Sequence, residues 1–96
     1  MFVVIYSRVI DNKKKGLELE GPFIGPECDT MDEAHDACRA IVSPSKNTVL
    51  IRTYDLDEMS YQKAKEKAAE HFDVLFEHME AAAVMCDRPK RKRLKN

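Results

Sequence analysis

Residues 60–86 read SYQKAKEKAAEHFDVLFEHMEAAAVMC, and their periodicity is that of one long helix. Apolar residues recur every three or four positions, which is the spacing of one helix face. Acidic residues recur at the same spacing on a second face. Such a helix would be about 40 Å long, so we expect it to extend beyond the rest of a small domain. The apolar face contains Tyr61, Ala64, Ala68, Phe72, Leu75, Met79, Ala82 and Cys86, and the acidic face contains Glu66, Glu70, Asp73, Glu77 and Glu80.

Three stretches before this helix have the composition of β-strands. Phe2–Ile10 and Thr48–Leu56 are rich in β-branched and aromatic residues and are apolar on both faces, as buried strands are. Leu17–Glu20 alternates apolar and acidic residues, which predicts a short strand with one face in water. We expect it to form a hairpin with the first strand. Two Gly-Pro pairs then interrupt the pattern, so Gly21–Pro26 is predicted to be a loop.

A first helix is predicted after this loop. Thr30 and Glu33 have the spacing of a capping box, and Ser43-Pro44 ends the helix. The element order is therefore ββαβα, and a right-handed crossover gives a three-stranded sheet of order 2-1-3. With both helices on one face, the fold would be a two-layer α+β sandwich with a long C-terminal helix. We expect one domain over residues 1–87 and a disordered basic tail over 88–96.

The net charge of −1 conceals a strong division between the two parts of the chain. The last nine residues hold six Lys or Arg and no acid, which leaves 10 basic and 17 acidic residues in the rest. This asymmetry indicates charged partners, either other molecules or a second copy of the chain.

The cysteines and the hydropathy pattern favour a soluble, cytoplasmic protein. Three cysteines, Cys28, Cys38 and Cys86, are an odd number without a CxxC pair, which argues against a disulfide framework. Phe2–Ile10 lacks the basic flank of a signal peptide. No apolar run approaches the roughly 20 residues that a membrane span requires, so we expect no contact with a membrane.

The titratable residues do not have the spacing of a metal, cofactor or catalytic site. His71 and His78 would lie about 10 Å apart along a helix, too far to share one ion. Phosphate-binding loops, GxSxG and HExxH are absent. Cys28, in a loop near a helix N-terminus, has the best position for a reactive thiol, although an ordinary loop residue is the better interpretation. We therefore expect no cofactor and no enzymatic activity.

The long helix supports the functional hypothesis. Aromatic and Met side chains beside charged residues are typical of protein interfaces, so we expect a regulatory or inhibitory protein-binding module. A phage-type inhibitor of nucleic-acid machinery is its most concrete form, because negative charge repeated along a rod can occupy a groove built for phosphates. The same helix could join two copies in a homodimer. The predicted contact residues are Glu66, Glu70, Asp73, Phe76, Glu77, Met79, Glu80, Val84 and Met85.

The alternative is a nucleic-acid-binding module. A basic hairpin tip and a basic tail could grip phosphates without sequence preference. Tyr6 and Tyr54 are expected on one sheet face, but acidic residues surround them, which argues against base stacking there. The residues of this alternative are Lys13, Lys14, Lys15, Arg88, Lys90, Arg91, Lys92, Arg93 and Lys95.

Overall fold

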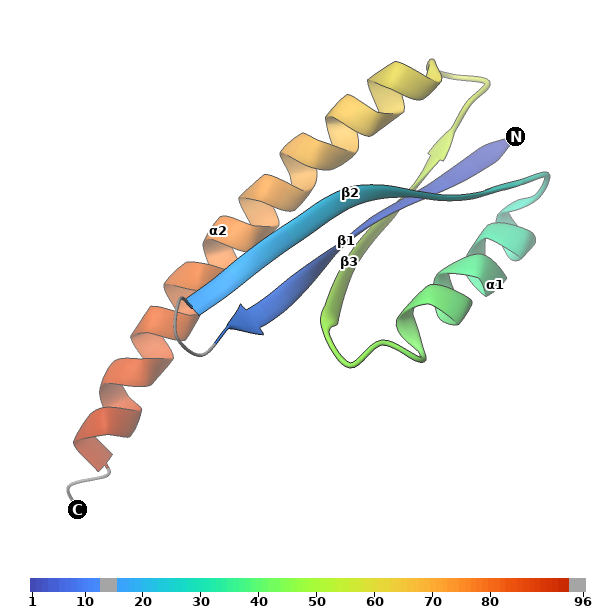
Figure 1. Cartoon of the computed structure of the whole chain (residues 1–96). Helices are drawn as coiled ribbons and strands as arrows, with labels where there is room; N and C mark the ends of the chain where they lie inside the picture. Colours follow the sequence, from blue (N-terminus) through green and yellow to red (C-terminus); the bar gives the residue numbers. More distant parts are fainter. Residues whose placement is uncertain (13–15, 94–96) are drawn as a thin grey trace.

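The computed structural model describes residues 1–12 and 16–93, with side chains as far as residue 82. The described residues form a three-stranded sheet and two helices, and Figure 1 shows how these elements are arranged. The α+β class, the element order and the sheet order β2-β1-β3 are as predicted. The elements are β1 (Phe2–Asn12), β2 (Gly16–Cys28), α1 (Met31–Val42), β3 (Thr48–Asp55) and α2 (Tyr61–Arg93). The tail expected over 88–96 stays a prediction, since its side chains lie outside those described.

The central strand β1 is antiparallel to both of its neighbours. It pairs with β3 without interruption, from Phe2 opposite Asp55 to Val9 opposite Thr48. Its pairing with β2 shifts register twice, between Val3 and Ile5 and between Tyr6 and Arg8. The apolar character of both faces of β1 therefore has the predicted cause, which is a central position in the sheet.

The loop predicted for Gly21–Pro26 is wrong, because β2 continues through both Gly-Pro pairs to Cys28. Proline cannot donate a hydrogen bond to a neighbouring strand, but an edge strand has one side without a neighbour. The two register shifts accommodate the irregular backbone. Gly21 itself has a φ of +125°, which residues with a side chain rarely adopt.

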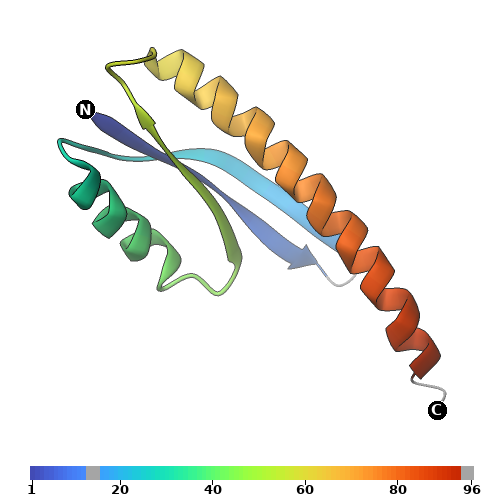
Figure 2. The same ribbon diagram turned by 180° about the vertical axis from the view of Figure 1, so that it is seen from behind.

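The two helices cover opposite faces of the sheet, so the expected two-layer arrangement with both helices on one face is wrong. Val3 and Ile5 of β1 pack against α2, whereas Val4 packs against α1. Because successive side chains of a strand point to opposite faces, these contacts place one helix on each side. Figure 2 shows β3 in front, with α1 and α2 on either side of it.

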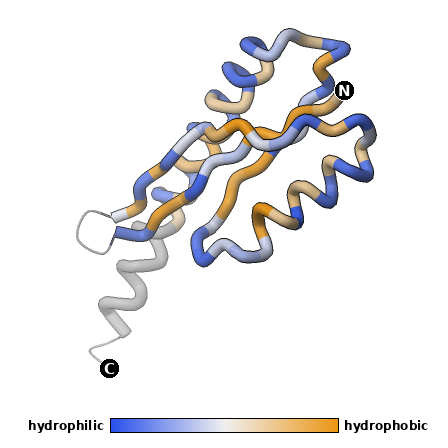
Figure 3. Tube along the Cα trace, turned by 45° about the vertical axis from the view of Figure 1, so that its right-hand side comes forward, coloured by the Kyte–Doolittle hydropathy of each residue, from blue (hydrophilic) through white to orange (hydrophobic). Residues whose placement is uncertain are grey.

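Two small cores result from this arrangement. In the core beneath α2, Ala64 and Ala68 let the helix backbone approach the sheet and Phe72 fills the remaining space. Figure 3 shows apolar residues concentrated in the strands, with alternating hydropathy in the helices. The α2 core contains Val3, Ile5, Tyr54, Ala64, Ala68 and Phe72, and the α1 core contains Val4, Cys28 and Ala34.

Both helices begin at polar caps. The backbone N–H of Glu33 donates to Thr30 Oγ1 at 3.2 Å, which confirms the predicted cap of α1. The N–H of Lys63 donates to Ser60 Oγ at 3.2 Å at the start of α2. These bonds satisfy amide groups that have no partner within their own helix.

The sheet is longer than the sequence suggested, and this changes the relation between α2 and its support. With 11 residues, β1 spans about 36 Å. Residues 61–82 of α2 span about 33 Å. Over the part of the helix with described side chains, the two lengths match, and the expected overhang does not arise there.

Candidate protein-binding surface

The rotation of α2 about its axis is set by its buried face. Ala64, Ala68 and Phe72 are at most 1% exposed and pack against β1 and β3. Successive residues of a helix are rotated by about 100°, so these three residues determine the direction of every other side chain. The five predicted acidic residues then lie on the side of α2 that faces water.

This acidic face (Glu66, Glu70, Asp73, Glu77 and Glu80) lies about 160° around the helix from the buried face. All five side chains are exposed. Glu66 accepts a hydrogen bond from Gln62 Nε2 at 3.1 Å. In residues 1–12 and 16–82, the one ion pair joins the Met1 amino group to Asp57. The acidic face therefore has no basic partner among these residues.

The predicted apolar anchors are less available than the sequence suggested. Phe76 and Met79 are half-buried, since the sheet is long enough to reach them. Val84 and Met85 lie outside the described side chains. Val74, which the sequence analysis did not select, is 52% exposed and is the most exposed large apolar residue of those described. It lies one turn from Glu70 and Glu77, beside the acidic face.

A groove between α2 and β3 was also missed from the sequence. Arg52 Nη1 lies 3.4 Å from His71 Nε2, and since a guanidinium can only donate, the ring nitrogen accepts. The guanidinium also lies 6.0 Å from the centre of the Tyr54 ring. In the sequence, the available signal for this site was Arg52, a single basic residue within an apolar strand. The residues lining the α2–β3 groove are Arg52, Tyr54, Met59, Lys67, Glu70, His71 and Val74.

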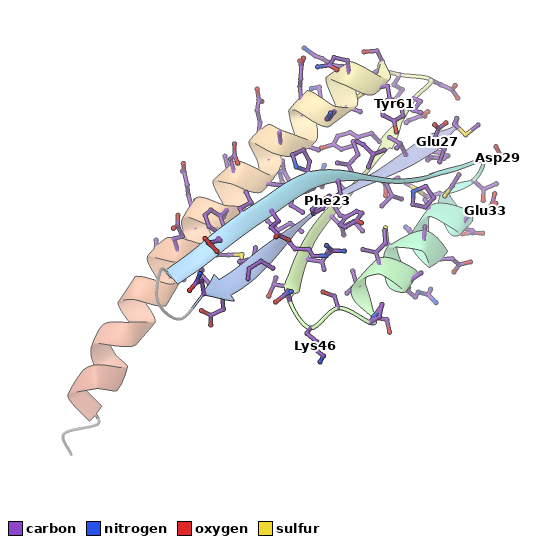
Figure 4. All side chains as sticks on the ribbon, in the orientation of Figure 1. Phe23, Glu27, Asp29, Glu33, Lys46 and Tyr61 are labelled. Atoms are coloured by element: carbon purple, nitrogen blue, oxygen red, sulfur yellow. The ribbon has the colours of Figure 1, made fainter. Side chains whose placement is uncertain are left out.

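The residues of the nucleic-acid alternative are not tested. Lys13–Lys15 and Arg88–Lys95 lie outside the described side chains. Tyr6 and Tyr54 lie on opposite faces of the sheet, so the expectation that they share one is wrong. Tyr6 instead packs against Phe23, with 5.3 Å between the two ring centres. Phe23 is labelled in Figure 4. The guanidinium of Arg8 lies 5.5 Å from the Tyr6 ring centre and 5.1 Å from that of Phe23. Arg8 therefore occupies the ring faces of Tyr6 and Phe23 on which nucleic-acid bases would stack.

The described part of the chain holds no group of three His, Cys, Asp or Glu side chains that could bind a metal ion. Cys38 Sγ lies 3.8 Å from Thr53 Oγ1, in the contact between α1 and β3.

Cys28 is buried rather than in an open loop. Burial, with smaller effects from Glu33, Cys38 and Asp29, raises the pKa of its thiol above the ordinary value of a cysteine. Figure 4 shows Asp29 and Glu33 near the start of α1. A thiol that stays protonated at neutral pH is a poor nucleophile, and this argues against a catalytic role for Cys28.

The raised pKa predicts a loss of stability at alkaline pH. Because the pKa is higher in the folded chain, the stability from the protonated thiol is complete below the unfolded value and is lost as the pH rises through the folded value. Urea unfolding at neutral and at alkaline pH should show a larger alkaline loss of stability for the natural chain than for Cys28→Ala. The tyrosines and lysines are common to both proteins, so their titration cancels. Equal losses in the two proteins would contradict the assignment.

Within the described residues, neither helix combines the length and the apolar composition needed to cross a membrane. Comparisons with protein-family models, curated proteins and solved structures find no match.

Proposed function

We propose that this chain is a non-enzymatic protein-binding module that contacts its partner, or a second copy, through α2. The observation that carries the proposal is the acidic face of α2, which is exposed along its length and unpaired with bases among the described residues. The helix is held against the sheet by its buried face. The carboxylates are therefore presented on a rigid element, which lowers the entropy lost on binding.

Like charges on this face oppose the helix that carries them. Glu66 and Glu70 are four residues apart, as are Asp73 and Glu77, and each such pair costs a few tenths of a kcal/mol. A basic partner would remove that repulsion and would be steered to the surface by its charge. Residues 66–80 extend over about 21 Å, a length suited to a basic groove or helix.

A regulatory or inhibitory role follows from this form of surface. A row of carboxylates can replace phosphates in a basic groove, so an inhibitor of nucleic-acid machinery, of the kind that phages encode, is the concrete form we propose. The support is the charge, the spacing and the rigidity of the acidic face.

The test compares two variants with the same change in net charge. The triple substitution Asp73→Asn, Glu77→Gln, Glu80→Gln removes three of the five carboxylates of the acidic face. The control Glu18→Gln, Glu20→Gln, Glu27→Gln neutralises three exposed carboxylates of β2. In crosslinking and capture from native cells, we expect the natural chain and the control to retain a common basic partner. The acidic-face variant should lose it by about tenfold or more.

Two outcomes would contradict the proposal. An equal loss of capture in both variants would show that the net charge of the chain, and not the acidic face, governs the contact. Unchanged capture by all three proteins would remove the acidic face from the interface. Light scattering of each protein tests whether a second copy is the partner, in which case the dimer should dissociate in the acidic-face variant alone.

A further inference from the structure

The two edges of the sheet differ in how well they are protected against pairing with another strand. The β2 edge contains Pro22 and Pro26, two register shifts, and exposed carboxylates at Glu20 and Glu27. Prolines, irregular pairing and charges are the common means by which proteins block an edge strand. The β2 edge is therefore a poor template for a further strand.

The β3 edge has no proline and no register shift, although Arg52 is an exposed charged residue within it. Over its eight residues β3 contains no glycine and no proline, and it pairs regularly with β1. In the described structure it has no second strand neighbour. Figure 2 looks toward this side of the sheet, and neither helix crosses in front of β3. A regular edge strand without proline is a ready site for strand addition.

A hollow lies on each face of the sheet beside β3. On one face is the α2–β3 groove described above, which contains Arg52, Lys67 and His71. On the other face, Cys38, Arg39, Val42 and Ser43 of α1 and its C-terminal cap line a shallow apolar hollow, which borders β3 where Cys38 Sγ lies 3.8 Å from Thr53 Oγ1. The side chain of Val42 is 45% exposed there. Side chains of an added strand would alternate between these two hollows, because the side-chain period of a strand is two residues.

The charges differ between the two hollows. In the groove, Arg52 and Lys67 have no carboxylate within ion-pair distance among the described residues. Glu70 is the one acidic residue of the groove lining, against the two basic residues Arg52 and Lys67. The groove is thus locally basic in an otherwise acidic body. It suits carboxylates, whereas the hollow beside Val42 suits apolar side chains.

We propose that the β3 edge binds an extended segment of a partner protein in which acidic and apolar residues alternate. The segment adds a fourth strand beside β3, with its carboxylates directed to Arg52 and Lys67 and its apolar side chains directed to Cys38 and Val42. This proposal deepens the protein-binding function proposed above, on which it rests, by adding a second contact of opposite charge.

The probe is the peptide Thr-Val-Glu-Val-Glu-Val-Thr, blocked at both ends, titrated into the isotope-labelled full chain. Two control peptides replace both glutamates with lysine, or the central valine with proline. NMR should show shifts at β3 and the groove with the first peptide, and hydrogen exchange of β3 amides should slow. The proline peptide should bind less tightly, because it lacks a donor for the strand pairing.

Three variants of the chain test the charge contacts. Arg52→Gln and Lys67→Gln should each weaken binding of the glutamate peptide by up to about tenfold. Lys65→Gln removes an exposed lysine from another side of the same helix and should leave binding unchanged. All three positions are exposed, so circular dichroism should show unchanged folding.

Several results would overturn the proposal. These are equal affinity for the lysine or proline peptide, protection of β2 instead of β3, and no loss of affinity in Arg52→Gln. Slow exchange of β3 that depends on protein concentration without peptide would also overturn it, because a second copy would then occupy the edge. The acidic-face variant should still bind the glutamate peptide, so failure here is distinguishable from failure of the proposed α2 interface.

Discussion

Replacing Phe72 with alanine is expected to lower the free energy of unfolding by about 3–5 kcal/mol, which is the usual cost of deleting a buried phenyl ring. Phe72 is 1% exposed and is the largest of the fully buried side chains. It packs between α2 and the residues of β1 and β3. Its removal leaves a cavity that neighbouring Ala64 and Ala68 are too small to fill.

The expected loss is a large share of the total stability. Domains of this size are stable by about 5–15 kcal/mol, and each kcal/mol shifts the melting temperature by about 4–8 °C. The melting temperature of the Phe72→Ala variant should therefore fall by about 12–40 °C. Thermal and urea unfolding followed by circular dichroism would measure this loss.

Val74→Ala is the matched control for Phe72→Ala. Val74 lies two residues away in the same helix but is 52% exposed. Its truncation should change stability by less than about 0.5 kcal/mol. A similar loss in both variants would mean that the helix itself, and not its packing on the sheet, is being weakened. A small loss in Phe72→Ala would contradict the described core.

Gly21→Ala is expected to have the second largest effect, with a loss of about 2–4 kcal/mol. The φ of +125° at Gly21 is strained for any residue with a side chain. An added Cβ would also lie 2.5 Å from Ser7 Oγ and 3.1 Å from Ser7 Cα. Ser7 is buried on the central strand, so the backbone of β1 or β2 must move to relieve the contact.

A second glycine separates the two causes. Gly16 has a φ of +92°, but a Cβ there would meet no atom within 4 Å. Gly16→Ala should therefore show the backbone strain alone, at about 1 kcal/mol. Adding Ser7→Ala to Gly21→Ala should recover part of the loss, because the closest atom is then absent. Urea unfolding of the natural chain, Gly21→Ala, Ser7→Ala and the double variant gives the coupling between residues 21 and 7 directly. Equal losses for the two glycines would contradict the close contact with Ser7.

Much of the fold was predictable because it depends on local patterns. The cap at Thr30 and the period of residues 60–82 follow from hydrogen bonding and helix geometry over a few neighbours. The order β2-β1-β3 follows from the crossover rule and from the apolar character of both faces of β1. Each of these signals is present in a short stretch of the chain.

The wrong predictions concern features that depend on contacts between residues far apart in the chain. Gly-Pro pairs usually mark loops, but β2 tolerates them because it lies at an edge. The crossover rule constrains α1 alone, so the face covered by α2 was left open and was assigned wrongly. Val3 and Val4 point to opposite faces and are both buried, so each face of the sheet must be covered. The apolar character of both residues was therefore a sequence signal that the two helices lie on opposite faces.

The same distinction applies to the candidate site. The acidic side chains of α2 were identifiable because their spacing alone places them on one face, away from Ala64 and Ala68. The exposure of Phe76 and Met79 was not, since it depends on the length of β1 and β2. The groove joining Arg52 to His71 was also not identifiable, because the two residues belong to different elements.

The amino-acid sequence by itself determined the helices, the strands β1 and β3, the sheet order and the acidic row on α2, because these depend on residue spacing and on local hydrogen bonds. The tertiary structure alone decided which face each helix covers, which edge of the sheet is open, and which basic side chains meet beside β3. Those features depend on packing between residues far apart in the chain, whereas the periodicity of the sequence reports only the relation between neighbouring residues.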